Sequence, residues 1–490
     1  MIDVAVIGAG HNGLVCAAYL ARAGLSVECF ERRELPGGAC VTEELWPGVR
    51  ASPGAYTLSL LRAEIVHDLE LRRHGLSVQV HEPYLFAPFP DGRRVVTWSD
   101  PRRTANQLAA EWSRADADAY LAWSGARARA VERARPLMLE PPDRQRWLEA
   151  IGPELLGGAI ADELAGIPSE SIRVPFALQG LIGTLAGPED RGTSFVSLYH
   201  DLGEAAGWPG GWGYARGGMG AVTSALRAAA EAAGARVRLS APVERVLASD
   251  GHATGLVLEG GDEVRARVVI SNADPLQSAA LARVEPPPGW RQSGPVVKAM
   301  LLLDGLPDFP SCPGEEPWHG AIDIGYTLDD LSAAAADARA GRPASRPWIE
   351  AASQTSVDDS LAPPGRHALS LFCQCFPPDV DATRAADAAI ARFAEACPGL
   401  PDRIVDRLAL GPRELEARFG LTGGHIFHGE MLPGQLFESR IDRRRFGGID
   451  GLYLAGSGAH PGGAVTGAPG YLAARAVIED LAGGPRRCDS

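Results

Sequence analysis

An α/β fold is predicted by the first forty residues, which read as a Rossmann-type βαβ unit. The apolar strand Ile2–Ile7 runs directly into the glycine-rich turn Gly8–Gly13, and a helical segment covers residues 14–23. A second apolar strand, Val27–Phe30, ends at the carboxylate of Glu31. Strand, G-x-G-x-x-G turn, helix and acidic residue in this order are the signature of a dinucleotide-binding fold.

Each residue of the turn has a separate physical role. Gly8 permits the tight turn, Gly10 lets the backbone approach a pyrophosphate, and Gly13 lets the helix pack close to the strand. His11 and Asn12 complete the turn, and the first N–H groups and partial positive charge of the helix that follows face the phosphates. The turn therefore predicts the pyrophosphate site of a dinucleotide.

A carboxylate and a second glycine pair extend this site. Glu31 can accept hydrogen bonds from a ribose hydroxyl pair, and Gly37-Gly38-Ala39 lets the backbone pass close to a ligand just beyond the ribose. A nicotinamide enzyme has no special need for such a pair, whereas a flavin enzyme must clasp the pyrophosphate of extended FAD from a second side. Arg32 either meets a phosphate or lies on a solvated face. We therefore expect the cofactor to be FAD.

The C-terminal region predicts another part of the same site. A strand at 451–456 enters the glycine-rich loop 457–463, and the last helix is expected at 469–481. A second glycine loop followed by a helix N-terminus makes another anion site. This site suits the O2 edge of the flavin or its ribityl-phosphate arm.

Composition narrows the class of protein. A chain of 490 residues is too long for one core and predicts two or three domains. The net charge of −14 argues against nucleic acid as a partner. No apolar run reaches the roughly 18 residues that a membrane span needs, and the first strand begins at residue 2, so we expect neither a span nor a leader peptide. The eight cysteines form no C-x-x-C pair, which predicts reduced thiols and a cytoplasmic protein.

Segments along the whole chain resemble the flavin-dependent amine oxidase and phytoene desaturase superfamily. Within it, the sequence is similar to the phytoene-desaturase-related group that includes pyridine nucleotide-disulphide oxidoreductase domain-containing protein 2. The name of that group mentions disulphide chemistry, but this chain lacks the cysteine pair that would support it. The matching stretches are Gly8–Gly13, Phe30–Arg33 with Gly37–Ala39, Trp212–Gly220, Leu361–Gly365, Gly423–Gly429 and Leu454–Gly463.

This resemblance implies a glutathione-reductase-like FAD-binding domain with an inserted α+β substrate domain. The FAD-binding domain is expected from residues 1–90, 213–290 and 415–490, and the substrate domain from 91–212 and 291–414. An apolar strand at 268–270 is expected to rejoin the parallel sheet that the N-terminus begins. The implied FAD contacts are Gly8, Gly10, Gly13, Glu31, Gly38, Ala39, the backbone of Val243, Gly456, Gly458, Val465 and Thr466, with His11, Asn12, Arg32, Gly37 and Ser457 between them.

Three functions are compatible with these features. The first is an FAD oxidoreductase that desaturates or isomerises a small apolar organic substrate bound where the two domains meet. The second is an amine oxidase that uses oxygen; such enzymes hold the amine with aromatic side chains, and this chain has Ala464 at one aligned position. The third is a lipid-binding escort of prenylated GTPases, which need not keep intact phosphate loops. We favour the first, and peripheral membrane contact and the oligomeric state stay open.

Lys298 is the first candidate catalytic residue. It is the one lysine of the chain and lies in an apolar strand at 295–303. A strand of similar sequence in amine oxidases places its lysine near flavin N5 through a water, so the resemblance implies a charge beside the flavin. The alternative is an edge strand whose lysine faces water.

His460 is the second candidate, because it borders the C-terminal glycine loop. It either carries a proton, since an unperturbed imidazole titrates near neutrality, or only hydrogen-bonds the loop backbone. His425 and His428, with Glu430 nearby, invite a metal interpretation. Their spacing is loose and the fold uses flavin, so we expect no metal.

Overall fold

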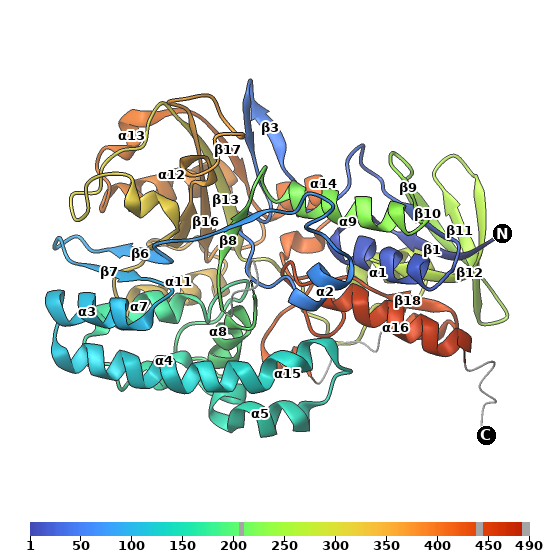
Figure 1. Ribbon diagram of the computed structural model, residues 1–490, viewed down its shortest axis with the longest axis horizontal. Helices are drawn as coiled ribbons and strands as arrows, with labels where there is room; N and C mark the ends of the chain where they lie inside the picture. The colour runs from blue at the N-terminus through green and yellow to red at the C-terminus, as the bar shows by residue number, and fades with distance from the viewer. Residues whose placement is uncertain (205–209, 438–443, 483–490) are drawn as a thin grey trace.

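The computed structural model describes residues 1–204, 210–437 and 444–482. In this part of the chain the strands form two seven-stranded sheets and two small two-stranded ones. The two large sheets lie in opposite halves of the molecule, and helices cover both (Figure 1). No described helix is long and apolar enough to cross a membrane.

The first sheet is assembled from segments that are far apart in sequence. Its order is β10-β11-β12-β1-β2-β9, and β18 also pairs with β12. The strands β18, β12, β1, β2 and β9 run parallel, whereas β10 and β11 form an antiparallel meander with β12. The bounds are β1 (Ile2–Ile7), β2 (Val27–Phe30), β9 (Arg236–Arg238), β10 (Val243–Ser249), β11 (His252–Leu258), β12 (Glu263–Ser271) and β18 (Leu452–Leu454).

The strand β12 joins two kinds of pairing. Residues 263–265 pair antiparallel with β11, and residues 266–271 pair parallel with β1. The prediction that residues 268–270 rejoin the sheet begun by the N-terminus is therefore confirmed. The strand is longer than expected, because the last strand of the meander and the returning strand are one continuous element.

Both faces of the first sheet are covered. The residues Val4 and Val6 pack with helices α1 (His11–Arg22), α9 (Gly220–Ala232) and α16 (Ala468–Ala482). The alternate residues Ala5 and Ile7 pack on the other face with the meander and with α10 (Pro275–Ala282). This alternation is the period-2 pattern of a strand that is buried on both faces.

The second sheet has the order β17-β13-β16-β15-β14-β6-β7. Its pairs are antiparallel except for β14 with β6. The chain enters this sheet at β6, before the expected domain boundary at residue 90. The bounds are β6 (Leu85–Pro88), β7 (Arg94–Thr97), β13 (Val296–Leu303), β14 (Ala321–Ile324), β15 (Trp348–Ala352), β16 (His367–Gln374) and β17 (Ile404–Leu410).

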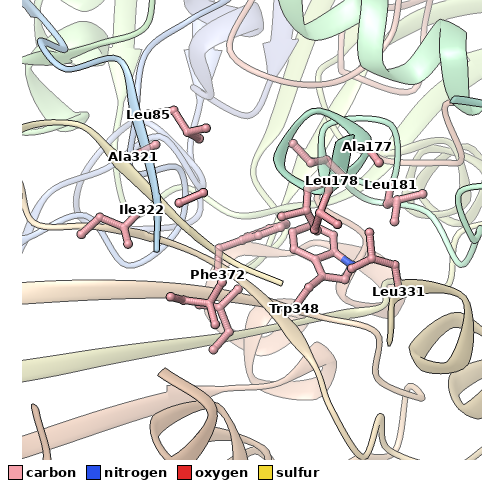
Figure 2. Close-up of a cluster of buried hydrophobic side chains, with 14 of the residues drawn as sticks. Leu85, Ala177, Leu178, Leu181, Ala321, Ile322, Leu331, Trp348 and Phe372 are labelled. Atoms are coloured by element: carbon pink, nitrogen blue, oxygen red, sulfur yellow. The ribbon is translucent and has the colours of Figure 1, made fainter. Parts of the chain in front are cut away.

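Helices pack against the second sheet and complete its core. Figure 2 shows Trp348 and Phe372 of the sheet with Leu178 and Leu331 from helices and Leu181 from the turn after residue 178. The longer helices are α3 (Pro101–Glu111), α4 (Arg114–Ala134), α5 (Arg144–Gly157), α7 (Glu170–Leu178), α8 (Thr193–Asp201), α11 (Leu328–Arg339), α12 (Ala382–Ala394) and α14 (Pro412–Phe419). The shorter elements are α2 (Ala63–Asp68), α6 (Ile160–Leu164), α13 (Leu400–Arg403), α15 (Pro433–Leu436), β3 (Glu43–Trp46), β4 (Val49–Ala51), β5 (Val78–Val80) and β8 (Gly213–Ala215).

Gln374 at the end of β16 ties the sheet to these helices. Its side chain is fully buried, and its Oε1 accepts a hydrogen bond from the N–H of Gly183 at 2.5 Å. Its Nε2 donates to the carbonyls of Leu181 at 2.8 Å and Thr184 at 3.2 Å. One amide therefore satisfies three backbone groups of the turn after α7.

We predict that Gln374→Leu lowers the free energy of unfolding by about 3 kcal/mol, because it removes the hydrogen-bond partner of the buried Gly183 N–H and Thr184 carbonyl at nearly constant side-chain volume. Denaturant unfolding followed by tryptophan fluorescence measures the change. The control is Gln145→Leu on the exposed face of α5, where we expect a change within about 0.5 kcal/mol. Equal stabilities for the two variants would contradict the assigned role.

Candidate functional site

A cavity of about 610 Å³ runs from the first sheet to the second. Its volume lies within the range of cofactor and substrate sites. One end is lined by the turn after β1 and the end of β2, and the other by Lys298, Glu350 and Phe372 of the second sheet. The predicted cofactor residues that line it are Gly8, Gly10, His11, Asn12, Glu31, Arg32, Gly37, Gly38, Ala39, Val243, Ser457 and Val465.

The turn after β1 is shaped to admit a diphosphate. Gly8 has φ +87°, a conformation that favours glycine. Gly10 caps α1 without any side-chain hydrogen bond, so the first N–H groups of the helix are left for a ligand. A Cβ at Gly13 would lie 2.4 Å from the carbonyl oxygen of Gly8, which shows how closely helix and strand approach. The turn fits the pyrophosphate of a dinucleotide.

Glu31 is held in place at the end of β2. It is 5% exposed, and its Oε2 accepts a hydrogen bond from the N–H of Ala9 at 2.9 Å. Its Oε1 accepts from the N–H of Arg33 at 3.0 Å. Each carboxylate oxygen keeps a second lone pair, so the group can also accept from ribose hydroxyls.

The second glycine loop lies directly beside the first. The N–H of Gly37 donates to the carbonyl of Ala9 at 2.9 Å, and Gly10 and Gly37 form a parallel bridge. Gly38 has φ +59°, again in the left-handed region. Arg32 borders the cavity, and its guanidinium donates to the carbonyl of Ala417 at 3.3 Å. The two loops thus approach a diphosphate from two sides, as FAD binding requires.

The C-terminal loop is fastened to the start of α1. Asn12 Nδ2 donates to Ser457 Oγ at 3.3 Å, and the ring Nε2 of His11 donates to the carbonyl of Ala464 at 3.2 Å. Burial lowers the pKa of His11 to about 4, so its ring is neutral at physiological pH. Among the predicted residues of this region, Ser457 and Val465 line the cavity.

Four predicted cofactor residues do not line the cavity. A Cβ at Gly456 would lie 2.6 Å from the carbonyl oxygen of Asn272, and one at Gly458 would lie 2.4 Å from Pro275 Cδ. These two glycines therefore allow close packing behind the site. Gly13 packs against the carbonyl of Gly8, and the carbonyl of Thr466 accepts from the N–H of Arg62 at 3.1 Å.

Lys298 lies at the opposite end of the cavity. β13 sits between β17 and β16, and Lys298 is 2% exposed, so the alternative of an edge strand with a solvated lysine is wrong. Its Nζ donates to Ser370 Oγ at 2.6 Å and lies 3.5 Å from the ring centroid of Tyr56. Burial lowers the pKa of the ammonium group to about 7. The charge of Lys298 therefore changes near neutral pH.

Two polar residues of this end were not found from the sequence. Glu350 on β15 accepts hydrogen bonds from the hydroxyl of Tyr56 and, at 3.2 Å, from Gln179 Nε2. Tyr56 and Glu350 line the cavity with Lys298, although they come from separate parts of the chain. The available signal was a glutamate inside the otherwise apolar strand Trp348–Ala352. A charged residue inside an apolar strand indicates either a partner or a functional site.

His460 is 2% exposed, and it is not among the residues that line the cavity. Its position gives no support to proton transfer inside the cavity.

The two histidines that invite a metal interpretation lie apart from each other in their roles. His428 lines the cavity. His425 is buried, and the Nδ1 of His425 accepts a hydrogen bond from the N–H of Phe427 at 3.2 Å. In the described residues no three His, Cys, Asp or Glu side chains are grouped as metal ligands. The seven described cysteines are free thiols.

Comparison with known proteins agrees with this geometry. The family described as flavin containing amine oxidoreductase matches residues 13–372. Pyridine nucleotide-disulfide oxidoreductase domain-containing protein 2 of Rattus norvegicus is 36% identical, with 98% of this chain and 94% of the relative covered. Hydroxyneurosporene desaturase of Cereibacter sphaeroides is 29% identical, with 98% of each chain covered.

A solved structure shows the same fold. An oxidoreductase from Methanosarcina mazei superimposes with a TM-score of 0.65 at 18% identity, with 98% of this chain and all of that chain covered. The family match spans most of the chain, and the glycine loops and Glu31 fit the cofactor that the family name implies. The chain therefore belongs to the flavin-containing amine oxidoreductase family and is an FAD-dependent oxidoreductase.

Proposed function

We propose that this enzyme desaturates or isomerises an apolar organic substrate bound at the second-sheet end of the cavity. The observation that carries the proposal is the lining of that end, where apolar and aromatic side chains surround the polar side chains of Tyr56, His200, Lys298 and Glu350. When bound, FAD supplies the oxidant, because it accepts a hydride from a substrate C–H bond. The apolar and aromatic residues of the lining are Leu60, Ile182, Trp212, Phe372, Ile426 and Phe427.

The alternation of two kinds of segment along the chain supports separate binding regions for FAD and for the substrate. We propose that residues 1–90, 213–290 and 415–490 hold FAD through backbone groups and Glu31, and that 91–212 and 291–414 hold most of the substrate. Leu60, Ile426 and Phe427 of the FAD-binding segments complete the substrate end. Similarity to a protein named hydroxyneurosporene desaturase supports a largely apolar, unsaturated organic molecule as the substrate class. Such a substrate needs apolar contact and shape far more than hydrogen bonds.

The lining gives little support to an amine substrate. Ala464 borders the cavity where an amine oxidase would present an aromatic side chain. The escort alternative has little support as well, since both glycine loops and the fixed Glu31 carboxylate are retained.

We propose that Lys298 acts through its charge at the substrate end. A cation in this position stabilises negative charge that develops during the reaction. Tyr56, whose ring lies under the ammonium, and Ser370, which accepts its hydrogen bond, hold the group in place. His460 is not assigned a role in this mechanism, because it does not border the cavity.

The substrate class is tested by anaerobic mixing of the FAD-loaded enzyme with phytoene or a hydroxylated acyclic carotenoid in detergent micelles. We expect loss of flavin absorbance with desaturation, or an isomerised product with the flavin oxidised at the end. Putrescine and NADPH serve as comparison reductants and should leave the flavin oxidised. Rapid reduction by putrescine, with none by the polyenes, would replace this proposal by amine oxidation.

Gly10→Val should yield a folded protein without flavin absorbance, because the added methyl groups occupy the approach of the diphosphate and a Cβ there already lies 2.6 Å from Asn272 Nδ2. Glu31→Ala should weaken FAD binding by about 1.5–3 kcal/mol, the value of hydrogen bonds to a charged group. Absorbance and FAD titration measure both effects. The control is Gly166→Val, where a Cβ meets nothing within 4 Å. Full flavin content in Gly10→Val would contradict the cofactor site.

Lys298→Met should keep its FAD and slow flavin reduction or reoxidation at least about tenfold, a barrier change of about 1.4 kcal/mol. The amine is charged below about pH 7, so the assisted step should slow as pH rises through about 7, and this dependence should vanish in the variant. Stopped-flow absorbance across pH measures both half-reactions. Arg407→Met on the neighbouring strand β17 removes an exposed cation and should leave the rates unchanged. Unchanged rates in Lys298→Met would exclude the proposed role.

A further inference from the structure

A row of buried side chains crosses four strands of the second sheet. Lys298 on β13 pairs with Phe372 on β16, Phe372 pairs with Glu350 on β15, and Glu350 pairs with Asp323 on β14. Residues opposite each other on neighbouring strands point to the same face of a sheet. None of the four is more than 3% exposed. One ammonium and two carboxyl groups are therefore brought to one face, although the sequence separates them widely.

The two carboxyl groups have different surroundings. Glu350 accepts hydrogen bonds from Tyr56 and Gln179, which stabilise its ionised form. Asp323 has no donor to either oxygen within the described residues, and it is 1% exposed. A buried carboxylate without donors or a cation beside it is costly, so burial raises the pKa of Asp323 well above its ordinary value. These surroundings favour a neutral Asp323 and an ionised Glu350.

Only one of the two acids reaches the cavity. Glu350 lines it together with Tyr56 and Lys298, whereas Asp323 lies behind and does not. Burial raises the pKa of Glu350 as well, which brings a carboxylate closer to the basicity that proton abstraction needs. The other titratable groups that face Glu350 and Asp323 are Lys298 from β13, Tyr214 from β8, and Tyr56 and Tyr84.

We propose that Glu350 is the proton acceptor of this cavity, with Asp323 kept neutral behind it. The proposal rests on the proposed function, in which desaturation removes a hydride from one carbon and a proton from its neighbour. The neighbouring C–H bond breaks, an O–H bond forms on Glu350, and the freed electron pair becomes the second bond of the alkene. The two electrons of the oxidation leave with the hydride, for which FAD is the oxidant.

The single lysine of the chain gives a direct test of the charge on each acid. Protein labelled with [ε-¹³C]lysine shows one lysine side-chain resonance, whose pH titration reports the pKa of Lys298. An ionised Glu350 raises that pKa, so Glu350→Gln should lower it by about one unit, whereas Asp323→Asn should leave it unchanged. A shift in Asp323→Asn alone, or in neither variant, would overturn the assignment.

A second measurement uses the unaltered protein, which keeps the test valid if a variant fails to fold. A protonated carboxyl absorbs in the infrared at a frequency that a carboxylate does not. At pH 8 we expect such an absorption, and labelling aspartate with ¹³C, but not glutamate, should move it. Movement with labelled glutamate alone would place the proton on Glu350 and overturn the proposal.

The catalytic role of Glu350 is tested separately, by the rate of flavin reduction. Glu350→Gln should retain its FAD and slow flavin reduction by the polyene at least about 100-fold, the lower range for loss of a general base. The control Glu132→Gln, on the exposed face of α4, should match the unaltered enzyme. If the unaltered enzyme oxidises the polyene and Glu350→Gln does so equally fast, Glu350 is not the acceptor. If the unaltered enzyme oxidises no polyene, the proposed function fails, while the lysine and infrared titrations still decide the charges.

Discussion

One residue fixes the geometry on which the cofactor site depends. The N–H of Ala9 donates to the carboxylate of Glu31, and the carbonyl of Ala9 accepts from the N–H of Gly37. The carboxylate proposed to bind the ribose and the second glycine loop are therefore positioned by the same residue, within the turn that opens α1. The backbone of Ala9 is itself held between β1, which lies inside the parallel sheet, and α1, which packs closely on that strand. The rest of the site is arranged around it.

Local sequence predicted this part of the molecule well, for a physical reason. The strand, turn, helix and carboxylate of the N-terminal unit are adjacent in sequence, and each has a steric or electrostatic requirement that few residues meet. Glu350 and Asp323 were not found, because strand register between distant segments brings them together, and Tyr56 reaches Glu350 from a loop far away in sequence. Lys298 was recognised as unusual, but only the position of β13 inside the sheet decides that it is buried. His460 was chosen from its neighbours in sequence, and it lies outside the cavity lining.

The two halves of the cavity use different chemistry. The first sheet offers backbone groups and glycines, which tolerate close approach and carry no net charge. The second sheet offers side chains in an apolar setting, where each charge has a large effect because little water screens it. A charge on Lys298 or Glu350 is therefore weakly screened at this end. The same burial places the pKa of Lys298 near neutrality in the folded protein, below its ordinary value in the unfolded chain. Between about pH 7 and that ordinary value the lysine is protonated in the unfolded chain but not in the folded protein. The free energy of unfolding therefore rises with pH across this range.

The parallel pairing of β18 with β12 affects how the protein is made. The last strand of the first sheet comes from residues 452–454, whereas its first strand comes from residues 2–7. The two halves of the molecule therefore cannot be completed one after the other as the chain leaves the ribosome, because the first sheet waits for residues 452–454. Such long-range pairing slows folding, and until it forms the sheet has an exposed edge. The first sheet is therefore completed only after every strand of the second sheet has been synthesised.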